Sequence, residues 1–197
     1  MATMTAAGPS APFIPDEYEE PTDRGFVLPR GFEFVDGQLQ ELNVSQLSSY
    51  MAGRVYLKLA NFSDARRLGW VFPEGTSYQC FADDSTRIRR ADAAFHMLSK
   101  LTLEQLHTEG YSKVVPDLVV EVVSTHDGAD DVNRKWLEWL KAGVSLVWVV
   151  YPHDRMIHAY TSPRSVRLFS ESDTLTAEPV LPEFRLPMSE LFATPAG

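Results

Sequence analysis

The sequence predicts an α/β (α+β) fold, a mixed central β-sheet flanked by helices, on three observations. The segment Pro116–Ser124, PDLVVEVVS, is typical of a strand buried on both faces. A helical pattern over Asp131–Lys141 and a second apolar strand, Ser145–Val150, complete a right-handed βαβ unit with parallel strands. Beyond it, Met156–Thr161 and Ser165–Ser170 are expected to form an antiparallel pair at the edge of the sheet.

Length and composition favour one soluble globular domain. A chain of 197 residues can bury a hydrophobic core without disulfides or structural metal. The single cysteine, Cys80, excludes an internal disulfide and a zinc site of several cysteines, which fits a reducing compartment. We find no secretory signal pattern and no apolar run long enough for a membrane span, so we expect a cytoplasmic protein.

The net charge of -9 argues against a broad electropositive surface for nucleic acid. Residues 1–25 are rich in proline and hold five acidic residues against one basic residue, a net of -4. We expect this segment to be a flexible acidic tail, and residues 26–197 to form the folded domain. The domain would then carry the remaining charge of -5 and would still be acidic.

Two elements are expected before the first long strand. Residues Gly31–Leu42 alternate apolar and polar side chains around Asp36-Gly37, the pattern of two short strands joined by a tight turn. Ser45 can cap a helix that runs to about Asn61. Apolar residues at three- and four-residue spacing would form one face of this helix: Leu47, Tyr50, Met51, Val55 and Leu59.

The middle of the chain shows shorter signals. Strands are expected at Gly69–Phe72, at Thr76–Phe81 and at Ile88–Phe95, with a turn at Asp83–Ser85 and a short helix at Leu103–His107. The third of these strands runs through Asp92, an acid in front of the apolar run AAF.

Cap signals bound the long helix after Glu121. Asp130 or Asp131 is expected to cap its start and Gly143 to end it. Its predicted apolar face is formed by Val132, Trp136, Leu137, Trp139 and Leu140, and we interpret its tryptophans as packing residues. At the C-terminus, the prolines of Leu181–Leu191 favour an extended segment that ends in one helical turn.

Two acids interrupt the buried strand, Asp117 and Glu121. A side-chain period of two puts both on one face, and a buried carboxylate needs a cation or a metal. Four residues of strand separate them by about 13 Å, whereas an acid on a neighbouring strand would be about 5 Å away. The best candidate for that acid is Asp92, which with Glu121 suits Mg²⁺ or Mn²⁺. Asp117 would contribute through water or would cap the strand end.

Basic residues near these acids suggest phosphate chemistry. Lys135 lies early in the helix after Glu121 and can point back toward it, where a cation could stabilise developing charge on a phosphate. The alternative is a solvated lysine on a helix surface. Arg87, Arg89 and Arg90 form the basic cluster next to Asp92 and could hold nucleic-acid phosphates. A set of surface salt bridges is the alternative.

Other polar residues give weaker signals. His126 follows the acidic strand and could assist a proton transfer, although a loop histidine is more often merely exposed. Ser124 lacks the Gly-x-Ser-x-Gly elbow that a serine hydrolase of this fold class would need.

Several motifs together carry a family resemblance. The run PDLVVEVVS, then Lys135, Trp139, Ala142-Gly143-Val144 and LVWVVYP, resembles the Uma2 family of the restriction-endonuclease-like PD-(D/E)XK superfamily. The FEFVDGQL hairpin, Pro73–Gly75 and Asp92–Phe95 are similar too. The resemblance implies a restriction-endonuclease-like fold and an Mg²⁺- or Mn²⁺-dependent nuclease acting on DNA. Its site would be made from Asp92, Asp117, Glu121 and Lys135.

The sequence also departs from that family pattern. The superfamily lysine normally stands two residues after the glutamate, where this chain has Val123, so Lys135 would replace it from the helix. Gln38 stands where an acid commonly follows the hairpin glycine, and an N-terminal acid can complete the metal shell. The rival hypothesis is therefore a catalytically inactive nuclease fold that acts as an interaction or assembly module. An edge strand offers a route to a homodimer.

Overall fold

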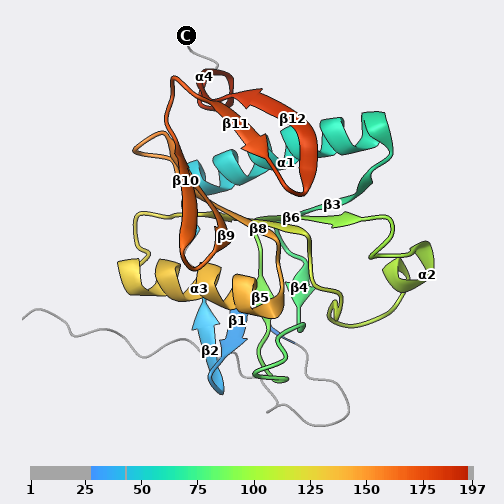
Figure 1. Ribbon diagram of the computed structural model, residues 1–197. Helices are drawn as coiled ribbons and strands as arrows, with labels where there is room; N and C mark the ends of the chain where they lie inside the picture. The colour runs from blue at the N-terminus through green and yellow to red at the C-terminus, as the bar shows by residue number, and fades with distance from the viewer. Residues whose placement is uncertain (1–27, 43, 195–197) are drawn as a thin grey trace, which may run out of the picture.

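A six-stranded mixed sheet forms the centre of the computed structural model, which describes residues 28–42 and 44–194 (Figure 1). The strand order is β10-β9-β8-β7-β6-β3. Its strands are β3 (Gly69–Pro73), β6 (Ala93–Met97), β7 (Leu118–Val122), β8 (Leu146–Tyr151), β9 (Met156–Ser162) and β10 (Ser165–Phe169). Neighbouring strands are antiparallel except for β7 and β8, so the predicted fold class is confirmed.

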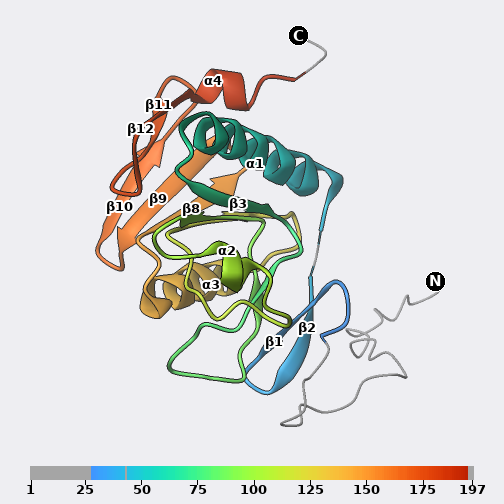
Figure 2. The ribbon, with the colours of Figure 1, turned by 90° about the vertical axis from the view of Figure 1, so that its right-hand side faces the viewer.

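Each face of the sheet is covered by different elements. Helix α1 (Gln46–Arg66) lies on one face together with β11 (Thr174–Ala177), β12 (Leu181–Pro187) and the one-turn helix α4 (Met188–Leu191) (Figure 1). Helix α3 (Ala129–Ala142) lies on the opposite face (Figures 1 and 2). Two separate hydrophobic clusters result, because side chains of each strand alternate between the two faces.

The predicted βαβ unit is confirmed. Strands β7 and β8 pair in parallel with Leu118 opposite Leu146, and α3 connects them. All five residues of β7 are buried, which explains why the strand is apolar on both faces. Gly143 ends α3 in the left-handed conformation, as predicted.

The start of α3 differs from the prediction. Gly128 is the N-cap and provides no side-chain hydrogen bond, while Asp130 and Asp131 lie inside the first turn. Acids in a first turn still stabilise a helix through its dipole. The prediction that one of them is the cap was therefore wrong by two or three positions.

The predicted strand Ile88–Phe95 is divided into two strands, because the chain bends at Asp92. Arg89–Arg90 form the short strand β5, which pairs with β4 (Ser77–Tyr78) in a separate two-stranded sheet. After the bend, β6 begins and enters the central sheet between β3 and β7. Of the predicted strand Thr76–Phe81, only the two residues of β4 pair.

The N-terminal hairpin is confirmed and lies on the α3 side of the sheet (Figure 2). Strands β1 (Phe32–Val35) and β2 (Gln38–Glu41) pair across Asp36 and Gly37, which both have positive φ. This is the backbone that a two-residue hairpin loop requires. A backbone bridge between Phe34 and Ile88 joins the hairpin to the segment before β5.

Helix α1 starts after Ser45, whose side chain accepts a hydrogen bond from the Ser48 amide, as predicted. It ends at Arg66, later than expected. Its buried face is Ser48, Met51, Ala52, Val55, Leu59 and Ser63. Leu47 and Tyr50, expected on that face, are 38% and 42% exposed, so the buried face of the helix differs from the predicted one at these two positions.

The C-terminal predictions are confirmed for β9, β10 and the extended segment that ends in α4. Strand β11, which pairs with β12, was not predicted. The short helix α2 (Leu103–Leu106) agrees with expectation. The predicted acidic tail, residues 1–25, lies outside the described residues. None of the described helices has the length and hydrophobicity needed to cross a membrane.

Candidate active site

Asp92 and Glu121 face each other across two neighbouring strands. The β6–β7 register pairs Ala93 with Val120 and Ala94 with Val119, so one step further places Asp92 opposite Glu121. The Asp92 amide donates to the Val120 carbonyl (3.0 Å), which extends this ladder. Side chains directly opposite each other on one sheet face have Cβ atoms about 5 Å apart. The sequence-predicted pair is thus brought together.

The Asp92 carboxylate has a structural role as well. Because β6 leaves the sheet at Asp92, the next amide of β7, that of Val122, has no strand partner. Asp92 Oδ2 accepts a hydrogen bond from this amide at 2.5 Å. The side chain therefore replaces a missing rung of the ladder and is held in place by it.

Glu121 is buried and bound through both carboxylate oxygens. Its Oε2 lies 3.0 Å from Lys135 Nζ, and its Oε1 accepts a hydrogen bond from Trp139 Nε1 at 2.6 Å. Both partners lie on α3, one turn apart, so the helix returns over the end of β7 as the sequence predicted. Lys135 keeps 21% of its side chain exposed, whereas Trp139 is fully buried.

A third acid, Glu33 of β1, joins this site and was not predicted. Its Oε1 lies 3.3 Å from Lys135 Nζ and 2.7 Å from the Arg90 amide that donates to it. Lys135 thus bridges Glu33 and Glu121. The signal was available, because Glu33 is the one polar side chain in the strand FEFV, and all four of these residues are buried. An acid from the N-terminal hairpin is present after all, at position 33 rather than 38.

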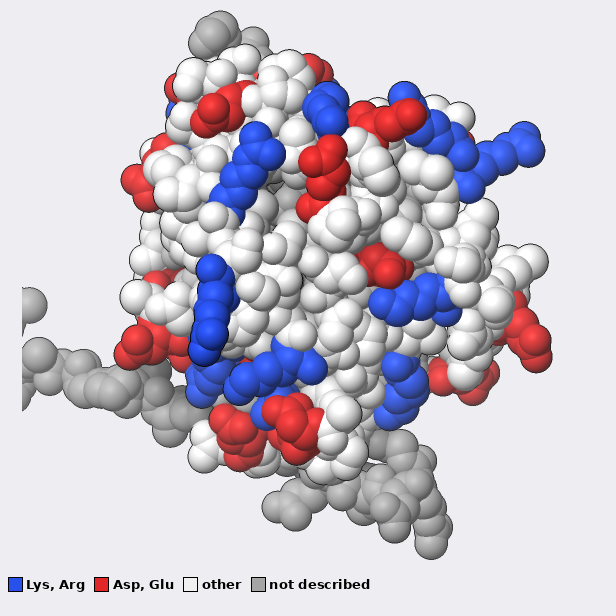
Figure 3. Space-filling view, in the orientation of Figure 1, with Lys and Arg blue, Asp and Glu red and all other residues white. Residues whose placement is uncertain are grey.

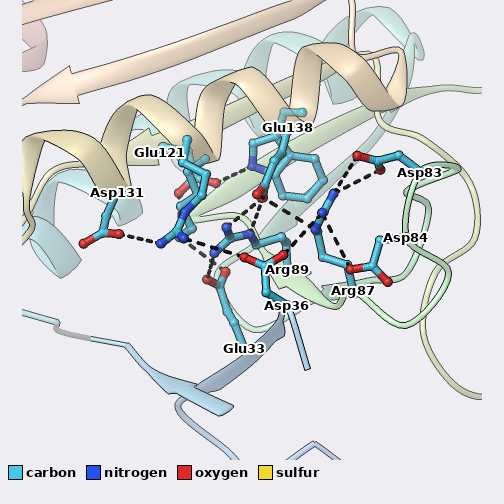
Figure 4. Close-up of polar contacts among 12 residues, drawn as sticks. Glu33, Asp36, Asp83, Asp84, Arg87, Arg89, Glu121, Asp131 and Glu138 are labelled. Atoms are coloured by element: carbon cyan, nitrogen blue, oxygen red, sulfur yellow. Dashed lines mark hydrogen bonds and ion pairs between the residues drawn. The ribbon is translucent and has the colours of Figure 1, made fainter. Parts of the chain in front are cut away.

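Arg89 connects the hairpin to α3 beneath this site (Figure 4). Its guanidinium donates to Glu33 Oε2 at 2.8 Å and to Glu138 Oε2 at 2.8 Å. Arg87 lies beside it, 3.0 Å from Asp83 and 3.9 Å from Glu138 (Figure 4). With 2% and 7% exposure, Arg89 and Arg87 form a buried ion-pair network.

The predicted phosphate contacts of Arg87 and Arg89 do not fit this arrangement, since a buried arginine that is paired with carboxylates is not offered to a ligand. Both residues instead fit the alternative of salt bridging, although inside the protein rather than on its surface. Arg90 differs, because it lines the pocket next to Asp92 and its guanidinium donates to the Pro29 carbonyl (3.3 Å).

Asp117 lies at the other end of the β6–β7 pair. Its Oδ2 accepts a hydrogen bond from the Met97 amide at 2.8 Å, and its Oδ1 lies 3.2 Å from Lys100 Nζ. The side chain caps the strand end, which was one of the two roles expected for it. It does not reach the Asp92–Glu121 site, because four residues of β7 separate it from Glu121.

Burial and mutual repulsion shift the acids of the site. Burial raises the pKa of Asp92 to about 8, and the neighbouring Glu121 adds to this rise. Burial also raises the pKa of Glu121, although Lys135 opposes it. Burial acts in the same direction on Glu33, but Lys135 and Arg89 outweigh it and hold the pKa of Glu33 below its ordinary value. Burial disfavours the charge of Lys135, yet Glu121, Glu33 and Asp92 raise its pKa.

A pocket opens over these residues. It is lined by Glu33, Asp92, Glu121 and Lys135, by Arg90 and Arg134, and by His126 in the loop before α3. Its free volume of about 150 Å³ has room for several water molecules.

The acids of this pocket fit a hard divalent ion of the kind that keeps several waters. The described residues contain no group of three or more His, Cys, Asp or Glu side chains arranged for a metal. Mg²⁺ is usually bound by one or two carboxylates, which matches Asp92 and Glu121. Burial, with the charge of Glu121 as the second cause, raises the pKa of Asp92 to about 8, and a divalent ion would favour the ionised form of this carboxyl.

Comparisons with known proteins agree with the fold and with the motifs. Residues 28–189 match the family model Uma2, described as "Putative restriction endonuclease". A crystal structure described as a putative nuclease belonging to DUF820 from Anabaena variabilis is similar to this chain, with a TM-score of 0.68. The two are 16% identical over 82% of this chain and 89% of the other. No curated protein matches.

Proposed function

Because the chain belongs to the Uma2 family of restriction-endonuclease-like proteins, we propose that it is a metal-dependent endonuclease that hydrolyses phosphodiester bonds, with DNA as its substrate. The observation that carries this proposal is the cross-strand pair Asp92–Glu121 with Lys135 3.0 Å from Glu121, at the floor of an open pocket. Two carboxylates and a lysine at one point suit hydrolysis of a phosphodiester.

Asp92 and Glu121 are the residues that would hold Mg²⁺ or Mn²⁺. When bound, the ion would lower the pKa of a water molecule and supply positive charge to the phosphate. Asp92 must lose its proton to bind, so its raised pKa makes binding depend on pH. The Trp139 indole fixes one oxygen of Glu121, which leaves the other for Lys135 or for the ion.

Lys135 acts as a cation in this proposal. Its pKa is raised by three acids, so it stays protonated and cannot take a proton from an attacking water. It is suited instead to donating hydrogen bonds to a phosphate oxygen as charge develops there. Glu33, ionised and bound to Lys135 and Arg89, would hold the ammonium between the hairpin and the sheet. Asp117 has no direct part, because Lys100 and the Met97 amide occupy it.

Contacts with DNA would be local. Basic and acidic side chains are interspersed over the face seen in Figure 3, without a broad basic surface. Phosphate contacts of the backbone usually come from Arg and Lys. At the pocket these are Arg90 and Arg134, and Arg134 is also paired with Asp131 at 2.5 Å.

The test is cleavage of plasmid and single-stranded DNA with Mg²⁺ or Mn²⁺, for the wild type and for Glu121→Ala. We expect metal-dependent cleavage by the wild type and its loss in the variant. Chelation with EDTA should abolish cleavage and restored Mn²⁺ should recover it. Cleavage that persists in Glu121→Ala, in a preparation free of other nucleases, would contradict the proposal.

One observation favours the second candidate, an inactive nuclease fold used as an interaction or assembly module. Lys135 bridges Glu33 and Glu121, so an internal cation already compensates part of the acidic charge. Calorimetric titration with Mn²⁺ separates the two functions. Saturable binding supports the nuclease, whereas no binding together with no cleavage supports the module.

We further propose a cytoplasmic homodimer. The edge strand β10 exposes Val166 and Leu168, 49% and 54% accessible, and an edge strand can pair with a second copy. A lone cysteine suits a reducing compartment. Light scattering over a range of concentrations tests the dimer, and a monomer mass throughout would contradict it.

A further inference from the structure

A second cavity lies at the opposite end of the β6–β7 pair from Asp92. It has a volume of about 580 Å³ and is lined by the segment that leads into β4, by α2, by Thr108 and by residues 110–114. Pockets for small organic ligands measure about 300–1,000 Å³. The cavity is therefore large enough for a ring system, and neither the family match nor the nuclease site assigns anything to it.

Aromatic rings form part of its wall. His96 and Tyr78 are stacked with centroids 5.8 Å apart, and Phe72 meets His96 edge-on at 5.5 Å. Tyr111 lines the cavity from the loop that follows α2. Tyr78 and His96 are 0% and 1% exposed, so it is the partly buried rings of Phe72 and Tyr111 that offer stacking and edge contacts to a planar ligand.

One ring nitrogen of His96, which lines this cavity, has no hydrogen-bond partner among the described residues. The residue is 1% exposed, and its Nε2 lies 3.4 Å from the Tyr78 hydroxyl. Its Nδ1 is buried without a hydrogen-bond partner among the described residues. Burial lowers the pKa of His96 to about 4, so the ring is neutral and has one donor and one acceptor. One of these is unsatisfied, which is costly inside a protein.

Charge is confined to the rim. None of the described residues that line the cavity is acidic, and the one basic residue is the exposed Lys113, whose ammonium bonds the Gln79 side chain. A ligand that matches this distribution has a neutral planar ring with hydrogen-bonding groups and an anionic group at one end.

We propose that this cavity binds a nucleobase, with its sugar and phosphate at the rim beside Lys113. The base could belong to a free nucleotide or to an unpaired position of a nucleic-acid strand. Tyr78 packs at 5.6 Å against Trp139, the residue that donates to Glu121, so one aromatic wall separates the two sites. His96 and Asp92 lie on the same face of β6, about 13 Å apart along the strand.

Binding requires neither metal nor cleavage, so the proposal is independent of the nuclease function. The experiment is calorimetric titration of the full chain in EDTA with adenosine and with AMP. We expect saturable binding of AMP, weakened about five- to tenfold in His96→Phe, which keeps the ring but loses the nitrogens. Lys113→Gln should weaken AMP about threefold and leave adenosine unchanged. Arg164→Gln, which removes a positive charge from the exposed turn between β9 and β10, should bind as the wild type does.

A second variant guards against misfolding of His96→Phe. Leu106 of α2 is half-buried and lines the cavity, so Leu106→Trp should fill part of it and should also reduce binding. Thermal melting shows whether each variant is folded. Where AMP does not bind, a single-stranded oligonucleotide is compared with the same strand carrying abasic positions. If the abasic strand binds the wild type more weakly than the intact strand, and the two strands bind His96→Phe equally, the cavity is assigned to a base within a strand. No binding of AMP and no effect of abasic positions would overturn the proposal, as would binding that both folded variants leave unchanged.

Discussion

The two ends of the β6–β7 strand pair are built alike, and they differ in the residue that lies opposite the capping aspartate. At one end Asp92 accepts a hydrogen bond from the Val122 amide, and at the other Asp117 accepts one from the Met97 amide. A lysine stands near each end, Lys135 and Lys100. The register places Glu121 opposite Asp92, but it places neutral His96 opposite Asp117.

This difference shows what separates a structural carboxylate from one available for chemistry. At the Asp117 end, one carboxylate is paired with Lys100 and with the Met97 amide, so its negative charge is compensated. At the other end three acids, Glu33, Asp92 and Glu121, converge on Lys135. Burial, together with the charge of Glu121, raises the pKa of Asp92 there, and this group of acids suits a divalent ion.

The largest expected effect is a loss of stability when Arg89 is replaced. This arginine supports the Asp92 end of the strand pair and not the Asp117 end. Arg89→Met leaves Glu33 and Glu138 without their buried partner, and this should cost about 3–5 kcal/mol of unfolding free energy. Lys100→Met removes a lysine whose side chain is 36% exposed, and Asp117 keeps the Met97 amide, so the cost should be less than about 1 kcal/mol. Urea denaturation measures both, and equal losses would remove the distinction between the two ends.

The paired lysines test the chemistry in the same way. Lys135→Gln should lower metal-dependent cleavage about 10²–10³-fold, because it removes the cation that would contact the phosphate. Lys100→Gln should remain within about threefold of wild type. Initial rates of plasmid nicking measure both. A comparable loss in the two variants would mean that Lys135 contributes through folding alone.

The two ends should also respond to pH with opposite signs. The folded pKa of Asp92, about 8, exceeds that of an unfolded aspartate, so the folded state holds more protons and stability falls as pH rises from about 4 to about 8. The folded pKa of His96, about 4, is below its unfolded value, so stability falls as pH drops from about 6.5 to about 4. Each slope is at most about 1.4 kcal/mol per pH unit.

Unfolding free energies across this pH range separate the two contributions by mutation. Between about pH 4 and pH 6.5 the two contributions oppose each other. Asp92→Asn should remove the fall in stability above pH 6.5 and unmask the rise below it, whereas His96→Phe should unmask a fall from about pH 4 to about pH 8. A variant with the pH dependence of the wild type would contradict the contribution assigned to its residue.

A smaller effect than that of Lys135→Gln is expected from Trp139→Phe. This change keeps an aromatic ring against Tyr78 and Phe81 but removes the donor to Glu121 Oε1. Losing one hydrogen bond to a buried carboxylate should cost about 1.5–3 kcal/mol, or roughly ten- to a hundredfold in metal affinity. Mn²⁺ titration measures this change, and an unchanged affinity would show that the indole only packs.

Local signals allowed much of the fold to be predicted. The Asp-Gly turn of the hairpin, the glycine that ends α3 and the valine-rich β7 each act through their own neighbours. The bend at Asp92 could not be predicted, because the segment Ile88–Phe95 contains no glycine or proline that would signal a break in a strand. What ends that strand is the capture of the Val122 amide, thirty residues away.

The site was predictable in part for the same reason. A period of two placed Asp117 and Glu121 on one face, and spacing favoured Asp92 as the partner of Glu121, in agreement with the register. Spacing could not reveal that Lys100 occupies Asp117. Glu33 was missed because an acid in a short hairpin usually faces water. Its burial depends on Arg89, which pairs in a different sheet.

The most direct test of the account is calorimetric titration with Mn²⁺ at pH 8.5, above the raised pKa of Asp92, for the wild type, Asp92→Asn and Asp117→Asn. Both variants keep an oxygen that can accept the capping amide. We predict that Asp92→Asn weakens Mn²⁺ binding at least about tenfold and that Asp117→Asn stays within about threefold of wild type. Loss of binding in Asp117→Asn with retention in Asp92→Asn would contradict the placement of the site.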